Sequence, residues 1–279
     1  MDSIKSIQQI RELFSSVRDK RKGFITNFFI DEFKHLIWIE KGVLFFESLD
    51  NTVFLVKESY DFWNVFFAAT NTVDFSNDLL HFKEKYVDAT MMFDIVGRNE
   101  QCSSILTIFQ EKGFLEYCSL VRMNRITSTM DNNKFISNVS KATIEQITDI
   151  YILLNKYFDK RTEQIPFIEE LEEYARLNHI LVYTDGNKII GFLIFEINAS
   201  TLYLRYWFVH PNYRDKKIGS TLLRSFFDEG KNTKRQFFWV IKSNDNALKR
   251  YKHYGFTEEN MFDYVLTSNN NILYEGTDY

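Results

Sequence analysis

Cysteine and proline are scarce in this chain, which has two of each among its 279 residues. Two thiols, Cys102 and Cys118, are too few for a disulfide scaffold or for a zinc site built on paired thiolates. Positive charge is not in excess either. The net charge of −4 argues against a nucleic acid as the main ligand, because Lys and Arg drive binding to a phosphate backbone. The five histidines are scattered without the spacing of metal ligands, so we expect no metal site.

Long apolar runs are also absent. No stretch reaches the roughly 18 apolar residues of a membrane-spanning helix. Residues 1–23 have the pattern of an amphipathic helix and lack the apolar centre of a signal peptide. We therefore expect a cytoplasmic protein without a membrane partner. What the chain does have is large apolar side chains, with 28 Phe, 15 Tyr and 4 Trp, which are enough to fill the cores of two domains.

The first half alternates between short apolar runs and amphipathic stretches. We expect strands at residues 35–40, 42–48, 52–58, 62–70, 89–97 and 114–123, and helices at 75–86 and 99–113. Residues 128–134 are small, polar and without periodicity, which is typical of a linker. The sequence therefore predicts a first domain at 1–127, a linker at 128–136 and a second domain at 137–279.

The second half has a sharper pattern. Thr143 followed by Gln146 is a capping box that opens a helix, and Pro166 stands at the first turn of another. Asp185 and Gly186 are a strong hairpin signal. The remaining pattern predicts strands at 180–184, 188–197, 201–209, 237–241 and 262–267, and helices at 218–230 and 244–255. This order predicts an α/β (α+β) fold with a mixed, mostly antiparallel sheet flanked by helices.

An internal repeat links the two halves. In each half a helix presents residues at i and i+4, ends near a glycine and continues as Gly-Phe into a strand. The matching residues are Ile105, Phe109 and Gly113 in the first half and Ala247, Tyr251 and Gly255 in the second. The order strand, helix, strand that precedes this pattern is the same in both halves. We therefore predict that the two halves share one fold.

The segment from residue 208 to 220 is the most informative for chemistry. A strand ends, the chain turns through Pro211, and a basic loop with Gly219 runs into a helix. The free N–H groups and the positive dipole end of such a helix form a cradle for an anion, and glycine lets the backbone approach a phosphate closely. The alternative from spacing alone is an ordinary strand–turn–helix connection with solvated basic side chains.

Two motifs in this half carry a family resemblance. Residues Arg214-Asp-Lys-Lys-Ile-Gly219-Ser resemble the pyrophosphate-binding motif Gln/Arg-x-x-Gly-x-Gly/Ala of the GNAT superfamily of acyl-CoA N-acyltransferases. The pattern Asn244-x-x-Ala-x-x-x-Tyr251-x-x-x-Gly-Phe is similar to the second motif of that family. The resemblance spans residues 137–267, with Lys217 where the family has its first glycine. It implies a tandem arrangement in which the second half is the catalytic GNAT domain and the first is GNAT-like.

The resemblance implies acetyl-CoA as co-substrate and assigns residues to it. Backbone groups at the end of strand 201–209 would pair with the pantetheine arm, the loop and first helical turn would hold the pyrophosphate, and Asn244 would hydrogen-bond the arm. Tyr251 would protonate the leaving thiolate, because a phenol donates to a developing charge without carrying charge itself. The implied cofactor-binding residues are Phe208, Val209, Arg214, Lys216, Lys217, Ile218, Gly219, Ser220, Thr221 and Asn244.

The general base and the acceptor are less determined by sequence. Many relatives place a Glu on the strand that runs into the cradle, but here that strand carries Arg205, and Glu196 on the neighbouring strand is the nearest carboxylate. Glu196 is therefore a catalytic candidate; a solvated surface role for it and a water chain past Tyr203 are the alternatives. Arg205 and Trp207 share a face and favour an amine that bears a carboxylate, such as an amino acid or peptide end. Alternatively, Arg205 pairs with Glu196.

Together these features predict an N-acetyltransferase that moves an acetyl group from acetyl-CoA to a primary amine of a small molecule, amino acid or peptide by direct attack, as a monomer or homodimer. The alternatives are an aminoacyl or other acyl transferase on the same fold, and a non-enzymatic acyl-CoA-binding sensor. The first half has Phe109 in place of Tyr251, and neither glycine nor a basic cluster in its matching loop. We therefore expect it to have lost the cofactor machinery and to shape the acceptor site.

Overall fold

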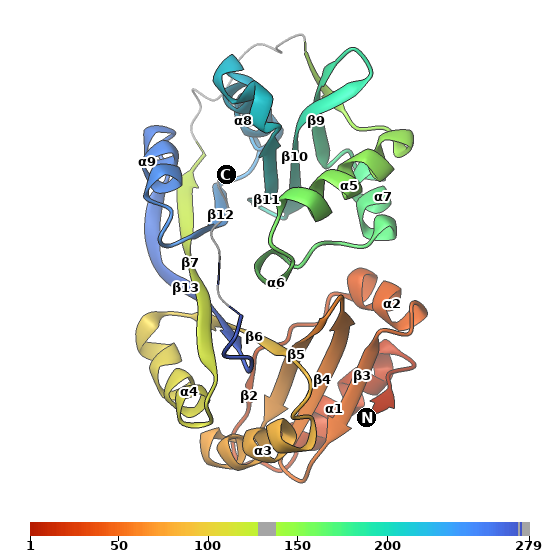
Figure 1. The fold of residues 1–279 in the computed structure, drawn as a ribbon, viewed down its shortest axis with the longest axis vertical. Helices are drawn as coiled ribbons and strands as arrows, with labels where there is room; N and C mark the ends of the chain where they lie inside the picture. The colour runs from red at the N-terminus through yellow and green to blue at the C-terminus, as the bar shows by residue number, and fades with distance from the viewer. Residues whose placement is uncertain (128–137, 273, 275–279) are drawn as a thin grey trace. The chain divides into compact units, whose positions relative to one another are not determined.

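The computed structural model describes residues 1–127, 138–272 and 274, and these residues form two compact units. The first unit comprises Met1–Leu120 and Asn260–Glu275, and the second comprises Val121–Glu259. Figure 1 shows the ribbon, coloured along the chain. The predicted linker at 128–136 lies outside the described residues, and the boundaries drawn along the sequence remain a prediction.

The first unit contains most elements of the first half of the chain. They are β1 (Asp2–Ser3), α1 (Ile7–Arg18), β2 (Ile25–Thr26), α2 (Glu32–Glu40), β3 (Leu44–Ser48), β4 (Thr52–Ser59), β5 (Phe62–Ala69), α3 (Thr72–Lys85), β6 (Met91–Gly97), α4 (Asn99–Glu111) and the start of β7 (Leu115–Ile126). The strand order is β1-β3-β4-β5-β6-β13, with β2 paired to β5. Neighbouring strands are antiparallel except β5 and β6, which are parallel.

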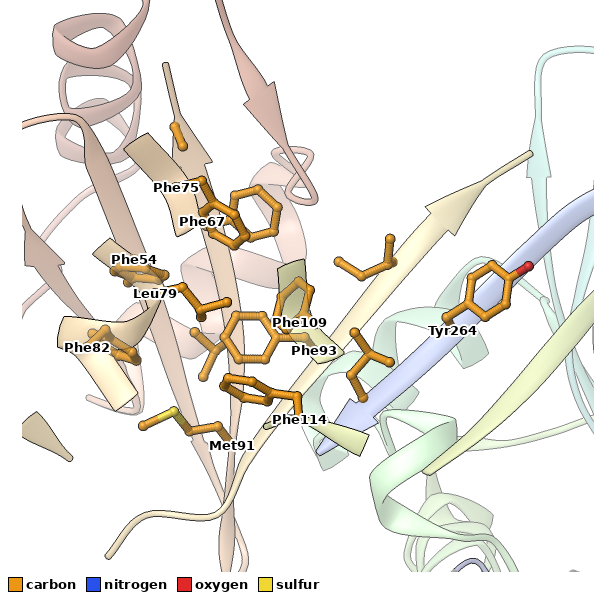
Figure 2. Close-up of a cluster of buried hydrophobic side chains, with 14 of the residues drawn as sticks. Phe54, Phe67, Phe75, Leu79, Phe82, Met91, Phe93, Phe109, Phe114 and Tyr264 are labelled. Carbon is orange, nitrogen blue, oxygen red and sulfur yellow. The ribbon is translucent and has the colours of Figure 1, made fainter. Parts of the chain in front are cut away.

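One face of this sheet holds the aromatic core shown in Figure 2. Rings from the sheet pack against rings from α3 and α4; Phe54 stacks on Phe82 with centroids 4.2 Å apart, and Phe67 stacks on Phe75 at the same distance. The buried members labelled in the figure are Phe54, Phe67, Phe75, Leu79, Phe82, Met91, Phe93, Phe109, Phe114 and Tyr264. The high phenylalanine content of the sequence is thus partly accounted for by one core.

The strand predicted at 35–40 is wrong, because these residues belong to helix α2. Asp31 caps the helix by accepting a hydrogen bond from the Lys34 N–H at 3.1 Å. His35 and Trp38 lie one helical turn apart and both are buried. A short apolar run fits a buried helix as well as a strand, and here the cap decides.

The second unit contains the elements of the second half. They are β8 (Val139–Lys141), η2 (Ile144–Gln146), α5 (Ile147–Tyr157), α6 (Lys160–Glu163), α7 (Ile168–Arg176), β9 (Ile180–Asp185), β10 (Lys188–Asn198), β11 (Thr201–Val209), η3 (Pro211–Lys216), α8 (Ile218–Glu229), β12 (Arg235–Ile241), α9 (Asp245–His253) and the start of β13 (Thr257–Thr267). The strand order is β7-β12-β11-β10-β9-β8. Each unit is thus a mixed, mostly antiparallel sheet flanked by helices, which confirms the predicted fold class.

Two local signals in this half are confirmed, and one is wrong: Pro166, predicted in the first turn of a helix, precedes Phe167, the N-cap of α7. The Thr143 N–H donates to the Gln146 side chain at 3.0 Å, as a capping box requires. Asp185 pairs with Lys188 across a two-residue turn in which Gly186 has φ +58°. Helices α5 and α7 cover one face of β10, while α8 packs on the other through Gly191 and Phe195 (Figure 1).

The last strand of each half divides between the two units. The chain leaves α4 as β7, whose residues up to Leu120 belong to the first unit and whose remainder belongs to the second. Strand β13 begins in the second unit and continues into the first, where Phe262–Thr267 pair antiparallel with β6. The first unit is therefore built from two separate stretches of sequence.

Candidate functional site

Strands β11 and β12 diverge after a short parallel contact. In the described part of the chain their pairing is limited to Thr201–Tyr203 opposite Arg235–Phe237. On its other edge β11 pairs with β10 along its length, from Thr201 to Val209. The backbone of Leu204–Val209 therefore faces a fork in the sheet on the side of β12. Phe208 and Val209, predicted to pair with an extended ligand, lie at this open edge.

Arg205 lies at a β-bulge beside the fork. Ile194 pairs with Tyr206 and Phe195 pairs with Leu204, so no residue of β10 lies opposite Arg205. Bulges bend a strand and redirect a side chain, and they are frequent next to active sites. Leu204, Tyr206 and Phe208 are buried, whereas Arg205 and Trp207 are partly exposed, as the predicted alternation requires.

The N-terminus of α8 follows the fork through η3 and Lys217. No side chain caps this helix, and its first turn contains no acidic residue. The first intrahelical bond runs from the Thr221 N–H to the Lys217 carbonyl at 3.0 Å, so the N–H groups of Ile218, Gly219 and Ser220 have no partner within the helix. Arg214, Lys216 and Lys217 are exposed around it. This arrangement suits an anion.

Lys217 adopts a left-handed conformation, with φ +60° and ψ +12°. Glycine reaches this region without steric cost, whereas a residue with a side chain pays roughly 1–2 kcal/mol. The backbone therefore makes a turn of the kind that glycine favours, and Lys217 adopts it under strain.

Replacing Lys217 tests this geometry by thermal unfolding. We expect Lys217→Gly to change the stability by no more than about 1 kcal/mol, because relief of strain offsets the greater chain entropy of glycine. Lys217→Val should destabilise the protein by clearly more, because a β-branched residue with positive φ is a genuine outlier. Equal stabilities for the two variants would contradict a left-handed residue at this position.

Gly219 allows α8 to lie close to β11. A Cβ atom added to Gly219 would lie 3.0 Å from Cζ2 of Trp207 and 3.5 Å from Cγ2 of Val209. The indole Nε1 of Trp207 is buried and has no hydrogen-bond partner among the described residues. A buried donor without a partner beside uncapped helix amides is consistent with a polar ligand at this place.

Tyr251 lies over both diverging strands. Its ring centroid is 4.2 Å from that of Phe238 on β12 and 5.7 Å from that of Trp207 on β11. Within the described residues its hydroxyl has no hydrogen-bond partner. Burial raises the pKa of the Tyr251 phenol above its ordinary value, so the group stays protonated at neutral pH. Tyr251 is thus a protonated phenol at the fork.

Asn244 and Tyr254 shape the helices around the fork. The Asn244 side chain caps α9 by accepting a hydrogen bond from the Ala247 N–H at 3.0 Å. The Tyr254 hydroxyl donates to Oγ of Ser220 at 2.9 Å, which connects α9 to the first turn of α8. The structure therefore gives Asn244 a capping function beside the ligand contact predicted from the motif.

Glu196 and Arg205 are brought together. The guanidinium Nε of Arg205 lies 3.6 Å from Oε1 of Glu196. Burial raises the pKa of the Tyr174 phenol, and its hydroxyl donates to the same oxygen of Glu196 at 2.5 Å. The pairing of Arg205 with Glu196, left open by the sequence, is thus present.

Glu163 is the acidic residue that the sequence analysis missed. It ends the short helix α6, and its backbone carbonyl accepts a hydrogen bond from the Tyr206 hydroxyl at 2.7 Å. Burial raises the pKa of its carboxyl group to about 7, against the opposing charge of Arg205 and with the help of Asp159. No motif marks this position; the only available signal was Asp159, a helix cap just upstream in an otherwise unassigned segment.

The first unit has the same fork, but its own chain fills it. Strands β5 and β6 pair only at Trp63–Asn64 and Met91–Met92 in the described part of the chain. Beyond that point β2 pairs with Ala68 and Ala69 of β5. The Asn27 side chain accepts from the Phe67 N–H at 2.8 Å and donates to the Asp94 carbonyl at 3.1 Å, which bridges the two strands.

The helix after this filled fork is capped. The Asn71 side chain accepts hydrogen bonds from the N–H groups of Val73 and Asp74, each at 3.0 Å. A hydrogen bond from Thr70 lowers the pKa of the Asp74 carboxyl, so a negative charge lies in the first turn of α3. In place of Tyr251 stands Phe109, which is 1% exposed in the aromatic core of Figure 2. The first unit thus has neither an open fork nor a free helix N-terminus at this place.

Removing the bridge in the first unit should destabilise it. We expect Asn27→Ala to lower the free energy of unfolding in urea by roughly 1–3 kcal/mol, because it leaves a buried N–H and a carbonyl unpaired. Gln8→Ala, an exposed change on α1, is the matched control and should stay within about 0.5 kcal/mol of the wild type. If both variants unfold alike, Asn27 does not hold the fork closed.

Two other features are absent from the described residues. None of their helices is both long and apolar enough to cross a bilayer. Nor do they contain a group of three or more His, Cys, Asp or Glu side chains that could hold a metal ion.

Comparison with known proteins gives a family match in the second half. Residues 146–256 match the model of the acetyltransferase (GNAT) family. This segment contains α8 with Lys217 and Gly219, and α9 with Tyr251. A search of curated proteins gives no match.

Solved structures share the fold over most of the chain. A GCN5-related N-acetyltransferase from Sphaerobacter thermophilus is 13% identical, with a TM-score of 0.56 over 88% of this chain and 95% of that one. A GNAT-family acetyltransferase from Colwellia psychrerythraea is 12% identical, with a TM-score of 0.54 over 95% and 98%. A tandem GNAT protein from the clavulanic acid biosynthesis pathway is 10% identical, with a TM-score of 0.51 over 78% of each chain. At these identities the likeness is one of fold, and it accords with a tandem arrangement. The second half of this chain therefore holds a domain of the GNAT acetyltransferase family, at residues 146–256.

Proposed function

We propose that the chain is an acetyl-CoA-dependent N-acyltransferase that acetylates a primary amine, with its site in the second unit. Acyl transfer in general follows from the family, whereas acetyl-CoA and the amine are our inference. The observation that carries it is the combination of an open fork, uncapped N–H groups of α8 and a protonated phenol over the fork. In the first unit the fork is filled by its own chain, and the uncapped N–H groups and the phenol are both missing among the described residues.

The residues present fit a CoA group. The N–H groups of Ile218, Gly219 and Ser220 would hold the pyrophosphate, with Arg214 and Lys216 adding positive charge. The open edge of β11 would pair with the amides of the pantetheine arm as an added strand does. The buried Nε1 of Trp207 has no hydrogen-bond partner among the described residues, so it would be available to donate to the bound group.

Acetyl-CoA would supply an activated thioester, and the residues of the chain would orient it and move protons. Tyr251 would donate its proton to the departing sulfur, because its raised pKa keeps it protonated and none of the described residues forms a hydrogen bond with its hydroxyl. The backbone amides near Val209, at the open edge of β11, would stabilise negative charge that develops on the carbonyl oxygen. The amine must be neutral when it attacks, so a base is also needed.

Thiol release from acetyl-CoA tests the proposal. The purified full chain is mixed with acetyl-CoA and a panel of primary amines, and free thiol is measured against the rate without amine. We expect amine-dependent release, with the acetylated amine detected by mass spectrometry. Release that no amine accelerates would leave the acyl-CoA-binding sensor as the better account.

A second candidate is transfer of an aminoacyl or larger acyl group on the same fold. The open fork does not discriminate between acyl groups. The same assay with propionyl-CoA and longer acyl-CoA thioesters decides, because kcat/KM for each donor reports the acyl chain that fits. We expect acetyl-CoA to have the highest value.

A further inference from the structure

The two carboxylates that interact with Arg205, those of Glu196 and Glu163, have different surroundings. Glu196 accepts a hydrogen bond from Tyr174 and lies 3.6 Å from the guanidinium of Arg205. In the described part of the chain no hydrogen bond or ion pair engages the carboxylate of Glu163. A carboxylate that is already satisfied by a donor and a cation is a poor proton acceptor. The two acids are therefore not equivalent.

The backbone of Glu163 is fixed beside β11. Asp159 caps α6 by accepting from the Arg161 N–H at 2.7 Å, and the Glu163 N–H donates to the Asp159 carbonyl at 2.9 Å. The Tyr206 hydroxyl donates to the Glu163 carbonyl at 2.7 Å. These bonds tie the end of α6 to the strand next to the bulge at Arg205, so the backbone that carries the Glu163 carboxylate is fixed beside β11.

The charges around Glu163 come from three elements. Asp159 lies on its own segment, Arg205 and Tyr206 lie on β11, and Tyr251 lies on α9. Tyr251 and Arg205 are both close enough for their charges to interact with that of Glu163. Glu163 is therefore within electrostatic range of the proposed proton donor. With a pKa of about 7, roughly half of the Glu163 carboxyl groups are ionised and able to accept a proton at neutral pH.

We propose that Glu163 is the general base that removes a proton from the acceptor, and that the acceptor binds as a cationic amine through Glu163 instead of as a carboxylate through Arg205. The charges favour this, because Arg205 is paired with Glu196, whereas Glu163 forms no ion pair with any described residue. An ammonium group is attracted to Glu163 and gives its proton to the Glu163 carboxylate; the neutral amine then forms the new N–C bond as the C–S bond breaks. The proton from Tyr251 goes to the sulfur, and the second proton that the nitrogen loses as the amide forms restores the Tyr251 hydroxyl. This inference rests on the proposed acetyl transfer.

Kinetics with two matched amines test the acceptor class. The probes are 1,4-diaminobutane and 4-aminobutanoate, which differ in whether the far end carries an ammonium or a carboxylate. Both probes present a reacting ammonium to Glu163. We expect kcat/KM for the diamine to exceed that for the amino acid by at least about 10-fold, because Glu163 repels the far carboxylate of 4-aminobutanoate and Arg205 is already paired with Glu196. Equal values, a preference for 4-aminobutanoate, or no thiol release with either amine would overturn the inference.

The variant Glu163→Gln tests the base. We expect kcat with the diamine to fall by roughly 10²-fold or more, the usual scale for a general base. In the wild type kcat/KM should rise with pH through about 7, as the Glu163 carboxyl loses its proton. In the variant that limb should vanish, and activity should recover partly at alkaline pH, where more of the amine is already neutral. Glu169→Gln, an exposed change on α7, is the control and should keep the wild-type profile.

Binding of acetyl-CoA distinguishes a failure of the proposed function from a failure of the proposed role of Glu163. Glu163→Gln should keep the wild-type dissociation constant for acetyl-CoA, because Glu163 is not among the groups proposed to hold the CoA arm or the pyrophosphate. If the wild type does not bind acetyl-CoA, the proposed function fails. If the wild type binds it and acetylates the diamine, but Glu163→Gln keeps the rate and the acidic limb, only the inference about Glu163 is overturned.

Discussion

Tyr251→Phe should lower kcat for acetyl transfer by roughly 10²-fold or more and leave the affinity for acetyl-CoA within about 2-fold. The substitution removes one oxygen atom and keeps the ring, so the contacts with Phe238 at 4.2 Å and Trp207 at 5.7 Å persist. Within the described residues the hydroxyl donates to no protein group, so its loss breaks no hydrogen bond in the fold. The effect should therefore fall on catalysis and not on stability.

Steady-state kinetics and calorimetric titration of acetyl-CoA check this expectation together. Tyr254→Phe is the matched control, because its hydroxyl bonds Ser220 beside the helix N-terminus instead of lying over the fork. We expect this control to alter acetyl-CoA binding more than kcat. A Tyr251→Phe enzyme with wild-type kcat would remove Tyr251 from the mechanism, and a loss of binding would give it a structural role.

Gly219→Asp should reduce the affinity for acetyl-CoA by roughly 10²- to 10³-fold. A Cβ atom at this position meets the Trp207 ring at 3.0 Å, and the added carboxylate lies where the proposed pyrophosphate binds. Two like charges about 4 Å apart near a protein surface repel by roughly 4 kcal/mol, which corresponds to about 10³-fold. Salt screening reduces this value at the exposed helix end.

Gly219→Ala separates the two causes, because it adds the methyl group without the charge. We expect its affinity to fall by about 10-fold or less. Isothermal titration of acetyl-CoA into the wild type and both variants gives the three constants. If Gly219→Asp binds as tightly as the wild type, the phosphates do not lie at the N-terminus of α8.

The fold of the second unit could be predicted well from its sequence. The hairpin at Asp185 to Lys188, the capping box at Thr143 and the helix after Lys217 all depend on interactions between residues a few positions apart. Such signals are visible in one sequence. The same holds for Gly219 and Tyr251, whose positions within motifs predicted where they lie in the fold.

Other features depend on partners that are distant in sequence. The run at 35–40 is a helix because of its cap and its packing, and its apolar pattern alone fits a strand equally well. The bridge made by Asn27 requires β5 and β6 to lie side by side before its side chain has any partner. No local pattern marks such a residue.

Glu163 shows why the candidate site was incomplete. Its surroundings come from Tyr206 and Arg205 on β11 and from Tyr251 on α9, which only the fold brings together. The sequence pointed instead to Glu196, since it lies on the strand next to Arg205. The structure does place Glu196 beside Arg205, and this pairing is what makes Glu196 the weaker candidate for a base.

The thermal stability of the full chain with and without saturating acetyl-CoA tests the central claim most directly, namely that the fork and the N-terminus of α8 form an acyl-CoA site. Ligand at about 100 times its dissociation constant should stabilise the folded protein by roughly 2.7 kcal/mol, which is visible as a higher unfolding temperature. Free CoA should act similarly, since the proposed contacts are to the arm and the pyrophosphate, and Gly219→Asp should abolish both shifts. An unfolding temperature that acetyl-CoA leaves unchanged in the wild type would contradict the account.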